Sequence, residues 1–132
     1  MWLVKTEPTA YAYADLARAR RAVWDGVKNR VALRNLQAMK VGDRVFVYHT
    51  GDEKAVVGVA EVVRSAYPDP QASFPIQAVV DLQAVGPLKH PVTLQAMKAR
   101  KEFEESPLVR QGRLSVVPLT LAQVKAIETL GE

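Results

Sequence analysis

The sequence predicts a small α+β domain: a mixed, mostly antiparallel β-barrel with flanking helices. Two observations carry this prediction. Five or six strand-like runs have helical patterns inserted between them, without the strict βα alternation of a parallel sheet. The two runs between Lys40 and Arg64 are apolar on both faces, so their sheet must be covered or closed on itself. The length of 132 residues fits one domain over residues 1–132.

The N-terminal part of the chain predicts a strand followed by a helix. Met1–Lys5 is a short apolar run, and Pro8 ends it because proline donates no backbone hydrogen bond. Ala14–Val23 has the spacing of a helix. Its expected buried face consists of Leu16, Ala19 and Val23.

A turn that contains Trp24 separates this helix from a second one. Asn29 can cap the second helix, because its side chain can accept the free backbone N–H groups of the first turn. Spacing places two sets of side chains on different faces. The core set is Ala32, Leu36 and Met39, and the solvent set is Arg30, Arg34 and Gln37.

The stretch Lys40–Arg64 predicts a β-hairpin at the centre of the sheet. Arg44–Thr50 and Ala55–Val63 are rich in residues that favour strands, and the polar segment between them favours a turn. The first strand ends in three side chains with polar tips, Tyr48, His49 and Thr50. A functional site is expected at this strand end.

The chain after the hairpin predicts a loop, a strand and a short helix. Ser65–Pro75 contains three prolines and is expected to be a loop. Ile76–Val85 alternates between apolar and polar residues, which indicates a half-exposed strand that Gly86 and Pro87 end. Thr93 is expected to cap a helix that reaches Arg100.

The last third of the chain predicts a closing strand and a final helix. Glu102–Pro107 is acidic and expected to be exposed, and Gly112–Val117 is expected to close the sheet. Thr120 and Gln123 form a capping box, which opens a helix that stops at Gly131.

Composition excludes several classes of function. The absence of cysteine excludes disulfides, thiolate metal sites and cysteine nucleophiles. The two histidines, His49 and His90, lie in no metal-binding motif, and the sequence has no P-loop and no G-x-S-x-G. No apolar window is long enough to span a membrane, and no secretory signal is recognisable. We therefore expect a soluble, cytoplasmic protein without cofactor, metal or membrane partner.

The distribution of charge favours a polyanionic partner. The net charge is +4 and the sequence pI is about 9.5. Seven Lys or Arg residues lie between Arg18 and Lys40, with a single acid, Asp25. One basic face is more typical of nucleic-acid binding than an even spread of charge.

A nucleobase needs an aromatic face, hydrogen-bonding edges and nearby positive charge for phosphate. Trp24 can supply the face. The candidates for the edges are Lys5, Thr6, Glu7, Asn29, Tyr48, His49, Thr50, Arg113 and Ser115. The candidates for phosphate are Lys28, Arg30 and Arg34.

Each candidate also has a purely structural interpretation. Trp24 can fill the core, Tyr48 and His49 can be satisfied interior residues, and Asn29 can act only as a helix cap. The basic stripe can be a solvated helix face, and Arg113 and Ser115 can simply close the sheet. Conversely, Glu7, Asp25 and His49 could form an acid–base group, which leaves an enzyme as an alternative.

Several segments together resemble the EVE domain family of the PUA-like superfamily. They are WLVKTEP (Trp2 to Pro8), VWDGVKN (Val23 to Asn29), LRNLQAMKVGDRVFVYHT (Leu33 to Thr50), VVGVAEVVRSAYPDP (Val56 to Pro70) and LVRQGRLSVVPLT (Leu108 to Thr120). The resemblance implies a PUA-like fold, a curved β-barrel flanked by helices. It also implies binding of modified bases, for which 5-methylcytosine and its oxidised forms in DNA have been proposed.

A more distant similarity to YTH domains, which bind N6-methyladenosine in RNA, concerns the pocket itself. Lys5, Thr6 and Trp24 match positions that contribute to the modified-base pocket of those domains, and Phe74 is a candidate for a second aromatic wall.

The sequence thus predicts a monomeric, non-catalytic module that binds RNA or DNA carrying a modified base. The alternatives are an enzyme that acts on nucleic acid or a nucleotide through Glu7, Asp25 or His49, and an interaction module whose pocket is vestigial.

Overall fold

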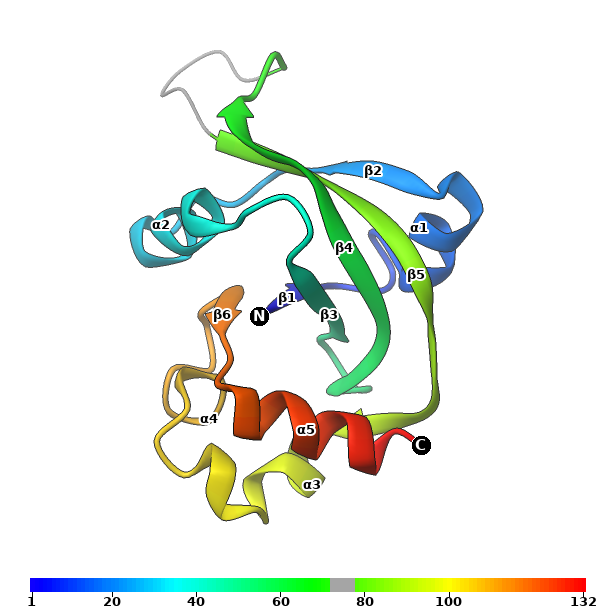
Figure 1. The fold of residues 1–132 in the computed structure, drawn as a ribbon, viewed down its shortest axis with the longest axis vertical. Coiled ribbons are helices and arrows are strands. Elements are labelled where there is room, and N and C mark those ends of the chain that lie inside the picture. Colours follow the sequence, from blue (N-terminus) through cyan, green and yellow to red (C-terminus); the bar gives the residue numbers. More distant parts are fainter. Residues whose placement is uncertain (72–77) are drawn as a thin grey trace.

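A six-stranded sheet organises the computed structural model, which describes residues 1–71 and 78–132 (Figure 1). The strands are β1 (Trp2–Thr6), β2 (Arg21–Trp24), β3 (Arg44–His49), β4 (Ala55–Pro68), β5 (Ala78–Thr93) and β6 (Val116–Pro118). The helices are α1 (Tyr13–Ala19), α2 (Arg30–Ala38), α3 (Leu94–Lys98), the 3₁₀ turn η1 (Lys101–Phe103), α4 (Pro107–Arg110) and α5 (Leu121–Leu130). Figure 1 shows α1 and α2 beside the two ends of β2, and α3, α4 and α5 grouped at the opposite end of the molecule.

The order of the strands is β2-β5-β4-β3-β1-β6. Only the β1–β3 pair is parallel among the paired strands of the described residues. The predicted α+β class and the mixed, mostly antiparallel sheet are therefore confirmed. The predicted hairpin is also confirmed, because β3 pairs with β4 from Arg44↔Glu61 to His49↔Ala55. Its side chains form the core, with Val45, Val47 and Val56 all fully buried.

The sheet is open, so the predicted closed barrel is not confirmed. In the described part of the chain, β2 pairs only with β5 and β6 pairs only with β1. Helix α2 packs against β6 and against β5, the strand next to β2, so it connects the two ends of the strand order. The Asn35 side-chain amide donates to the Val116 carbonyl at 2.8 Å, so the helix satisfies part of the β6 edge.

The predicted helix over Ala14–Val23 is wrong in its second half. The helix ends at Ala19, and Arg20 adopts a φ of 68°, in the left-handed region that residues other than glycine rarely enter. The chain then forms β2, which pairs with β5 from Arg21↔Gln83 to Trp24↔Val80. Leu16 is buried as expected, whereas Val23 is 48% exposed.

Strand β5 is longer than predicted, because it continues through Gly86 and Pro87 to Thr93. The pairing with β4 is irregular around this point, and proline is tolerated where a strand lacks regular ladder bonds. Asp81, one of the polar residues in the alternating pattern that predicted a half-exposed strand, is only 6% exposed and accepts a hydrogen bond from Arg21 at 2.8 Å. The predicted start of the strand at Ile76 lies outside the described residues, and β4 extends to Pro68 where a loop was expected.

The C-terminal part agrees with the sequence at its caps and differs elsewhere. Thr93 caps α3, and Thr120 and Gln123 form the capping box of α5, as predicted. The acidic stretch is only partly exposed, because it buries Phe103 completely. The closing strand spans only Val116–Pro118. Among the described residues, no helix has the length and apolar character that a membrane crossing requires.

Candidate functional site

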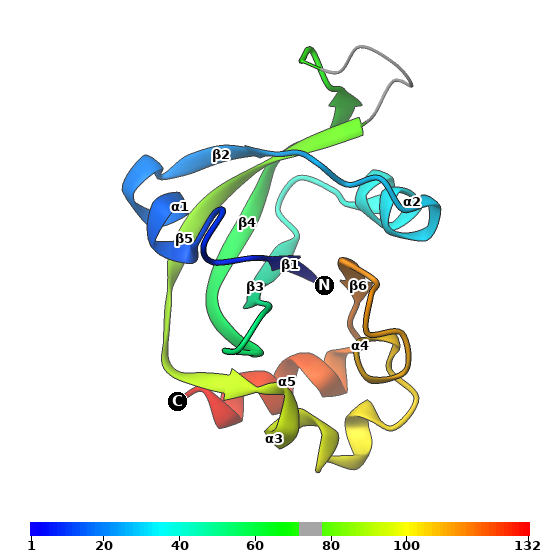
Figure 2. The ribbon, with the colours of Figure 1, turned by 180° about the vertical axis from the view of Figure 1, so that it is seen from behind.

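A surface cavity of about 330 Å³ lies where the end of β1 approaches β2. Its lining residues are Lys5, Thr6, Tyr11, Ala22, Val23, Trp24 and Asp25. Figure 2 shows the segment after β1 turning back toward α1, beside β2 and β5. The cavity therefore brings together two of the sequence motifs, Trp2 to Pro8 and Val23 to Asn29, although they are distant in the chain.

Trp24 serves both the core and the cavity. Its side chain is 7% exposed, so most of the ring packs inside the protein while a part faces the cavity. Tyr11 meets it edge to face, with ring centroids 6.2 Å apart and an interplanar angle of 79°. This is a favourable geometry for an aromatic pair. The two rings give the cavity two aromatic walls at nearly a right angle.

Lys5 and Thr6 form the β1 side of the cavity. The Lys5 ammonium donates to the Gly112 carbonyl at 2.9 Å and lies 5.5 Å from the centroid of the Tyr48 ring. Burial lowers the pKa of Lys5 from its ordinary value. Thr6 Oγ1 donates to the Tyr11 carbonyl at 2.7 Å, which fixes the loop that carries Tyr11. Lys5 keeps further ammonium protons for a ligand.

Glu7 and Thr50 hold the ends of β1 and β3 together beside the cavity rather than lining it. The Thr50 backbone N–H donates to the Thr6 carbonyl at 2.9 Å, and Thr50 Oγ1 donates to Glu7 Oε2 at 3.2 Å. Glu7 also accepts from the backbone N–H of Thr9, and this hydrogen bond is the main cause of the lowered pKa of Glu7.

His49 has both ring nitrogens engaged. Its Nε2 accepts from the backbone N–H of Tyr13 at 2.9 Å, so this nitrogen carries no proton in that arrangement. Its Nδ1 lies 2.7 Å from Glu53 Oε1 and is assigned as the donor from this network. His49 thereby satisfies the first N–H of α1, one of the groups that a helix leaves without an internal partner. Tyr48 is 4% exposed, and burial raises its pKa.

Asn29 caps α2 as predicted. Its Oδ1 accepts from Val31 N at 2.9 Å and from Ala32 N at 3.1 Å, so this oxygen is committed to the helix. The predicted phosphate-binding residues are all exposed at the start of α2 and along it. These residues are Lys28, Arg30 and Arg34, and none makes an ion pair within the described ranges.

The segment before β6 docks against β1. The Ser115 carbonyl accepts from the Lys5 backbone N–H at 2.9 Å, and Gly112 accepts from the Lys5 side chain. Arg113 is exposed in the turn between them. Neither Arg113 nor Ser115 lines the cavity.

Lys5, Thr6 and Trp24, which were predicted to bind a ligand, line the cavity, and so does Tyr11, which was not predicted. The signal that singled out Trp24, an aromatic residue in a turn, is also present at Tyr11 in the segment between β1 and α1. The sequence does not show that Tyr11 packs against Trp24, because the loop that carries Tyr11 is held in place by the Thr6 hydroxyl. Phe74, the candidate second wall, lies outside the described residues.

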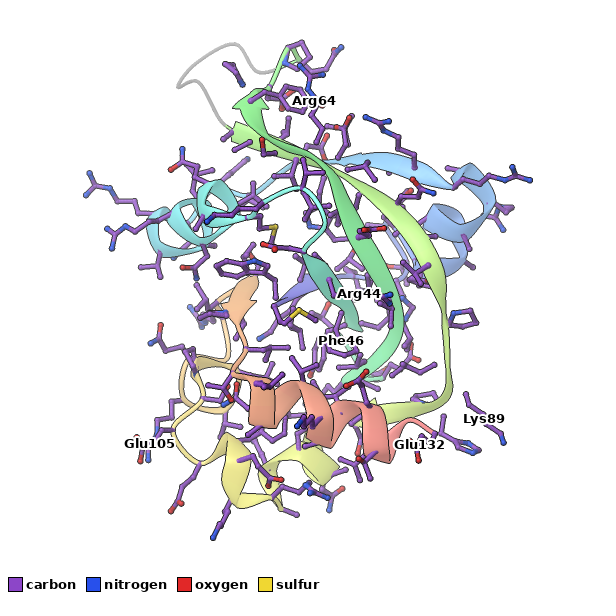
Figure 3. The ribbon with its side chains drawn as sticks, in the orientation of Figure 1. Arg44, Phe46, Arg64, Lys89, Glu105 and Glu132 are labelled. Atoms are coloured by element: carbon purple, nitrogen blue, oxygen red, sulfur yellow. The ribbon has the colours of Figure 1, made fainter. Side chains whose placement is uncertain are left out.

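A second hollow, of about 400 Å³, lies between α5 and the sheet. Figure 3 shows Arg44 and Phe46 on β3 and Glu132 beyond the end of α5, three of its lining residues. Arg44 is outnumbered there by the carboxylates of Glu128 and Glu132, so this hollow is less suited to a polyanion. Within residues 1–71 and 78–132, no group of three or more acidic or histidine side chains could hold a metal ion.

Comparison with known proteins gives consistent matches over the whole chain. A family model described as the EVE domain matches residues 1–130. Thymocyte nuclear protein 1 of Mus musculus is 29% identical over 165 aligned positions, which cover 99% of this chain and 73% of that protein.

Solved structures give the same result. The structure of Rpa0253 from Rhodopseudomonas palustris is 40% identical, with a TM-score of 0.91 over 98% of this chain and 91% of that one. The human THYN1 protein in complex with DNA containing 5-methylcytosine is 29% identical, with a TM-score of 0.86 over 99% of this chain and 96% of that one. An ASCH structure from Zymomonas mobilis, 12% identical with a TM-score of 0.64, shares the fold.

Proposed function

The chain belongs to the EVE domain family, and from this premise we propose that it binds DNA and receives one modified base in the cavity beside Trp24. The observation that carries the proposal is the cavity itself, which combines two aromatic walls with a lysine. That relative has been solved with DNA containing 5-methylcytosine. We also propose that the fold is of the PUA-like type, a curved β-barrel flanked by helices. In this barrel α2 fills the gap between β2 and β6.

The size of the cavity supports a single base rather than a whole nucleotide. Its volume of about 330 Å³ is at the lower end of the range for small-molecule pockets. The base therefore leaves the helix stack and enters alone, as in other proteins that read or modify a base. Its sugar and phosphates stay outside, on the surface that carries the basic side chains.

Two contacts hold the base. It lies against the part of Trp24 that faces the cavity, with Tyr11 as the second wall. Contact with aromatic side chains contributes about 1–3 kcal/mol per base. The remaining protons of the Lys5 ammonium donate to an acceptor on the edge of the base, and partial burial of this side chain lowers its pKa.

The cations at α2 supply affinity for phosphate. Lys28, Arg30 and Arg34 are exposed and free of ion pairs in the described part of the chain. If all three contact phosphates, the logarithm of the binding constant falls by roughly 2 to 3 for each tenfold rise in salt.

The module is proposed to be non-catalytic. Support for this comes from His49, whose two nitrogens are both engaged in hydrogen bonds and which is 7% exposed. Glu7 is likewise held by Thr9 and Thr50. Neither residue lines the cavity, so neither is placed to exchange a proton with a base bound there.

The test is fluorescence anisotropy with labelled DNA that carries one 5-methylcytosine or one cytosine at the same position. Trp24→Leu keeps an apolar side chain in the core, and its thermal unfolding shows whether it is folded. We expect the methylated DNA to bind more tightly to the unaltered protein, and Trp24→Leu to weaken that binding by roughly 5- to 100-fold.

Two controls make the result specific. Arg44→Gln removes a cation at the second hollow and should leave binding unchanged, whereas Arg30→Gln with Arg34→Gln should reduce both affinity and its dependence on salt. A folded Trp24→Leu protein that binds every DNA as tightly as the unaltered protein would refute the proposal. Equal binding of an RNA of the same sequence would widen the ligand to RNA.

A further inference from the structure

Asp25 is the acidic residue among those that line the cavity. It directly follows Trp24 at the end of β2 and precedes Gly26, whose φ of 78° turns the chain away toward α2. It is exposed and is the one acidic side chain among the seven lining residues. It is also the single acid in the basic segment from Arg18 to Lys40.

This carboxylate has no protein partner within the described residues. Most other acids near the sheet are engaged: Glu7 with Thr9, Asp43 with Trp2, and Asp81 with Arg21. No hydrogen bond or ion pair involves the Asp25 side chain within residues 1–71 and 78–132. A negative charge weakens the attraction for phosphate, so it is a cost at a nucleic-acid site unless it contacts the ligand.

An ionised carboxylate can accept hydrogen bonds but cannot donate them. The other side chains of the cavity differ in this respect. Lys5 can only donate, the side chains of Ala22 and Val23 are apolar, and the hydroxyls of Thr6 and Tyr11 are neutral groups that can accept. Among the lining residues, Asp25 therefore supplies the charged acceptor, which is the strongest partner for a donor on the edge of a base.

We propose that Asp25 is a specificity-determining residue that accepts a hydrogen bond from the 4-amino group of 5-methylcytosine and so excludes thymine. This inference rests on the proposed function. The two bases carry the same 5-methyl group. At position 4 cytosine has an amino donor and thymine a carbonyl acceptor, and at position 3 cytosine has an acceptor and thymine an N–H donor. Contact with the methyl group or with the aromatic walls cannot distinguish them.

The protein discriminates against thymine because thymine leaves the Asp25 carboxylate without a hydrogen-bond donor at position 4. With thymine in the cavity, the O4 acceptor faces the Asp25 carboxylate, and both have lost water without gaining a hydrogen bond. Sites that present a buried hydrogen-bonding group reject a ligand that lacks the partner more strongly than apolar pockets reject a change of size. We expect 5-methylcytosine to be preferred by roughly 10- to 100-fold.

The experiment compares two single-stranded oligonucleotides that are identical except for one 5-methylcytosine or one thymine. Single strands remove the difference between base pairs with guanine and with adenine. Affinities are measured for the unaltered protein, for Asp25→Asn and for Asp52→Asn. Asp52 is exposed in the β3–β4 turn, away from this cavity, and gives the same change of charge.

The expected result is a 10- to 100-fold preference for 5-methylcytosine in the unaltered protein and in Asp52→Asn. In Asp25→Asn the preference should fall to within about threefold, because an amide can offer either a donor or an acceptor. Thymine should bind more tightly to this variant than to the unaltered protein, an effect that loss of structure cannot produce.

The outcomes separate this inference from the proposed function. Full preference retained by Asp25→Asn overturns the role of Asp25, and so does equal binding of both bases by the unaltered protein. In both cases the proposed function stands as long as Trp24→Leu weakens binding. If Trp24→Leu has no effect on either oligonucleotide, the proposed function fails and this inference fails with it.

Discussion

Replacement of Gly58 by alanine should destabilise the protein through a single contact. A Cβ atom at Gly58 would lie 2.5 Å from Cε1 and Cζ of the Tyr13 ring and 2.6 Å from Cε2. Carbon atoms pack at about 3.5–4.0 Å, so the ring or the strand has to move by about 1 Å. Gly58 lies inside β4, and its φ is not in the left-handed region, so backbone strain is not the cause.

The Tyr13 ring cannot easily give way. It is 6% exposed, and its hydroxyl donates to the Val59 carbonyl at 2.7 Å. Its backbone N–H is held by His49 at 2.9 Å. Overpacking of a core costs about 1–3 kcal/mol, and the smaller entropy of an unfolded chain with alanine offsets about 0.4–1 kcal/mol. We expect Gly58→Ala to lower the free energy of unfolding by about 1–2 kcal/mol.

A double-mutant cycle isolates this contact. Tyr13→Ala removes the ring and should cost about 3 kcal/mol or more on its own. In that background Gly58→Ala should be neutral or slightly stabilising, because the added methyl group has no ring to meet. Urea unfolding followed by circular dichroism gives all four free energies. The reasoning is refuted if Gly58→Ala costs the same with and without the Tyr13 ring.

Two further predictions concern other parts of the fold. Asn29→Ala should lower the free energy of unfolding by about 1 kcal/mol, because α2 loses the cap that Asn29 Oδ1 provides. Asn29→Asp keeps an oxygen that can accept the same hydrogen bonds and should retain most of this free energy. Urea unfolding measures both variants. Burial opposes ionisation of Asp81, but hydrogen bonds from Tyr67 and Arg21 outweigh it and lower the Asp81 pKa below its ordinary value of 3.8. The ionised Asp81 carboxylate therefore contributes its full stability above pH 3.8, and this contribution is lost as the pH falls through the lower pKa of the folded state. In acid, the urea midpoint of unfolding should fall less steeply for Asp81→Asn than for the unaltered protein.

The sequence predicted the elements whose signals are local. The central hairpin has strand-forming residues on both sides of a polar turn, and α2 and α5 begin at recognisable caps. Strand β2 was missed because Arg21–Val23 continue the helical pattern and Trp24 was assigned to a turn. The strand forms because Arg20 adopts a positive φ and β5 offers an edge. Neither condition is visible in the sequence around Arg20.

The site divides in the same way. Trp24 and Lys5 were predicted from residue type and position, and both line the cavity. Tyr11 was missed because its position depends on a hydrogen bond from the Thr6 hydroxyl. The sheet is open where a closed barrel was expected, and α2 contacts the β6 edge through Asn35. His49 was expected at a ligand-binding strand end, whereas its two hydrogen bonds tie α1 to the β3–β4 turn. For the barrel and for His49, a contact distant in sequence decided the outcome.

In the binding mode proposed above, some charges at the site supply affinity and another supplies specificity. Lys28, Arg30 and Arg34 lie in solvent, so their attraction for phosphate is screened by salt and acts on any sequence. A base that enters the cavity covers Asp25 and takes this carboxylate out of water, where salt screens it little. Both affinities should therefore fall as salt rises, while the ratio between 5-methylcytosine and thymine stays nearly constant. A lone acid inside a basic segment is then explained by selectivity, because on grounds of affinity alone the position would favour a neutral or basic residue.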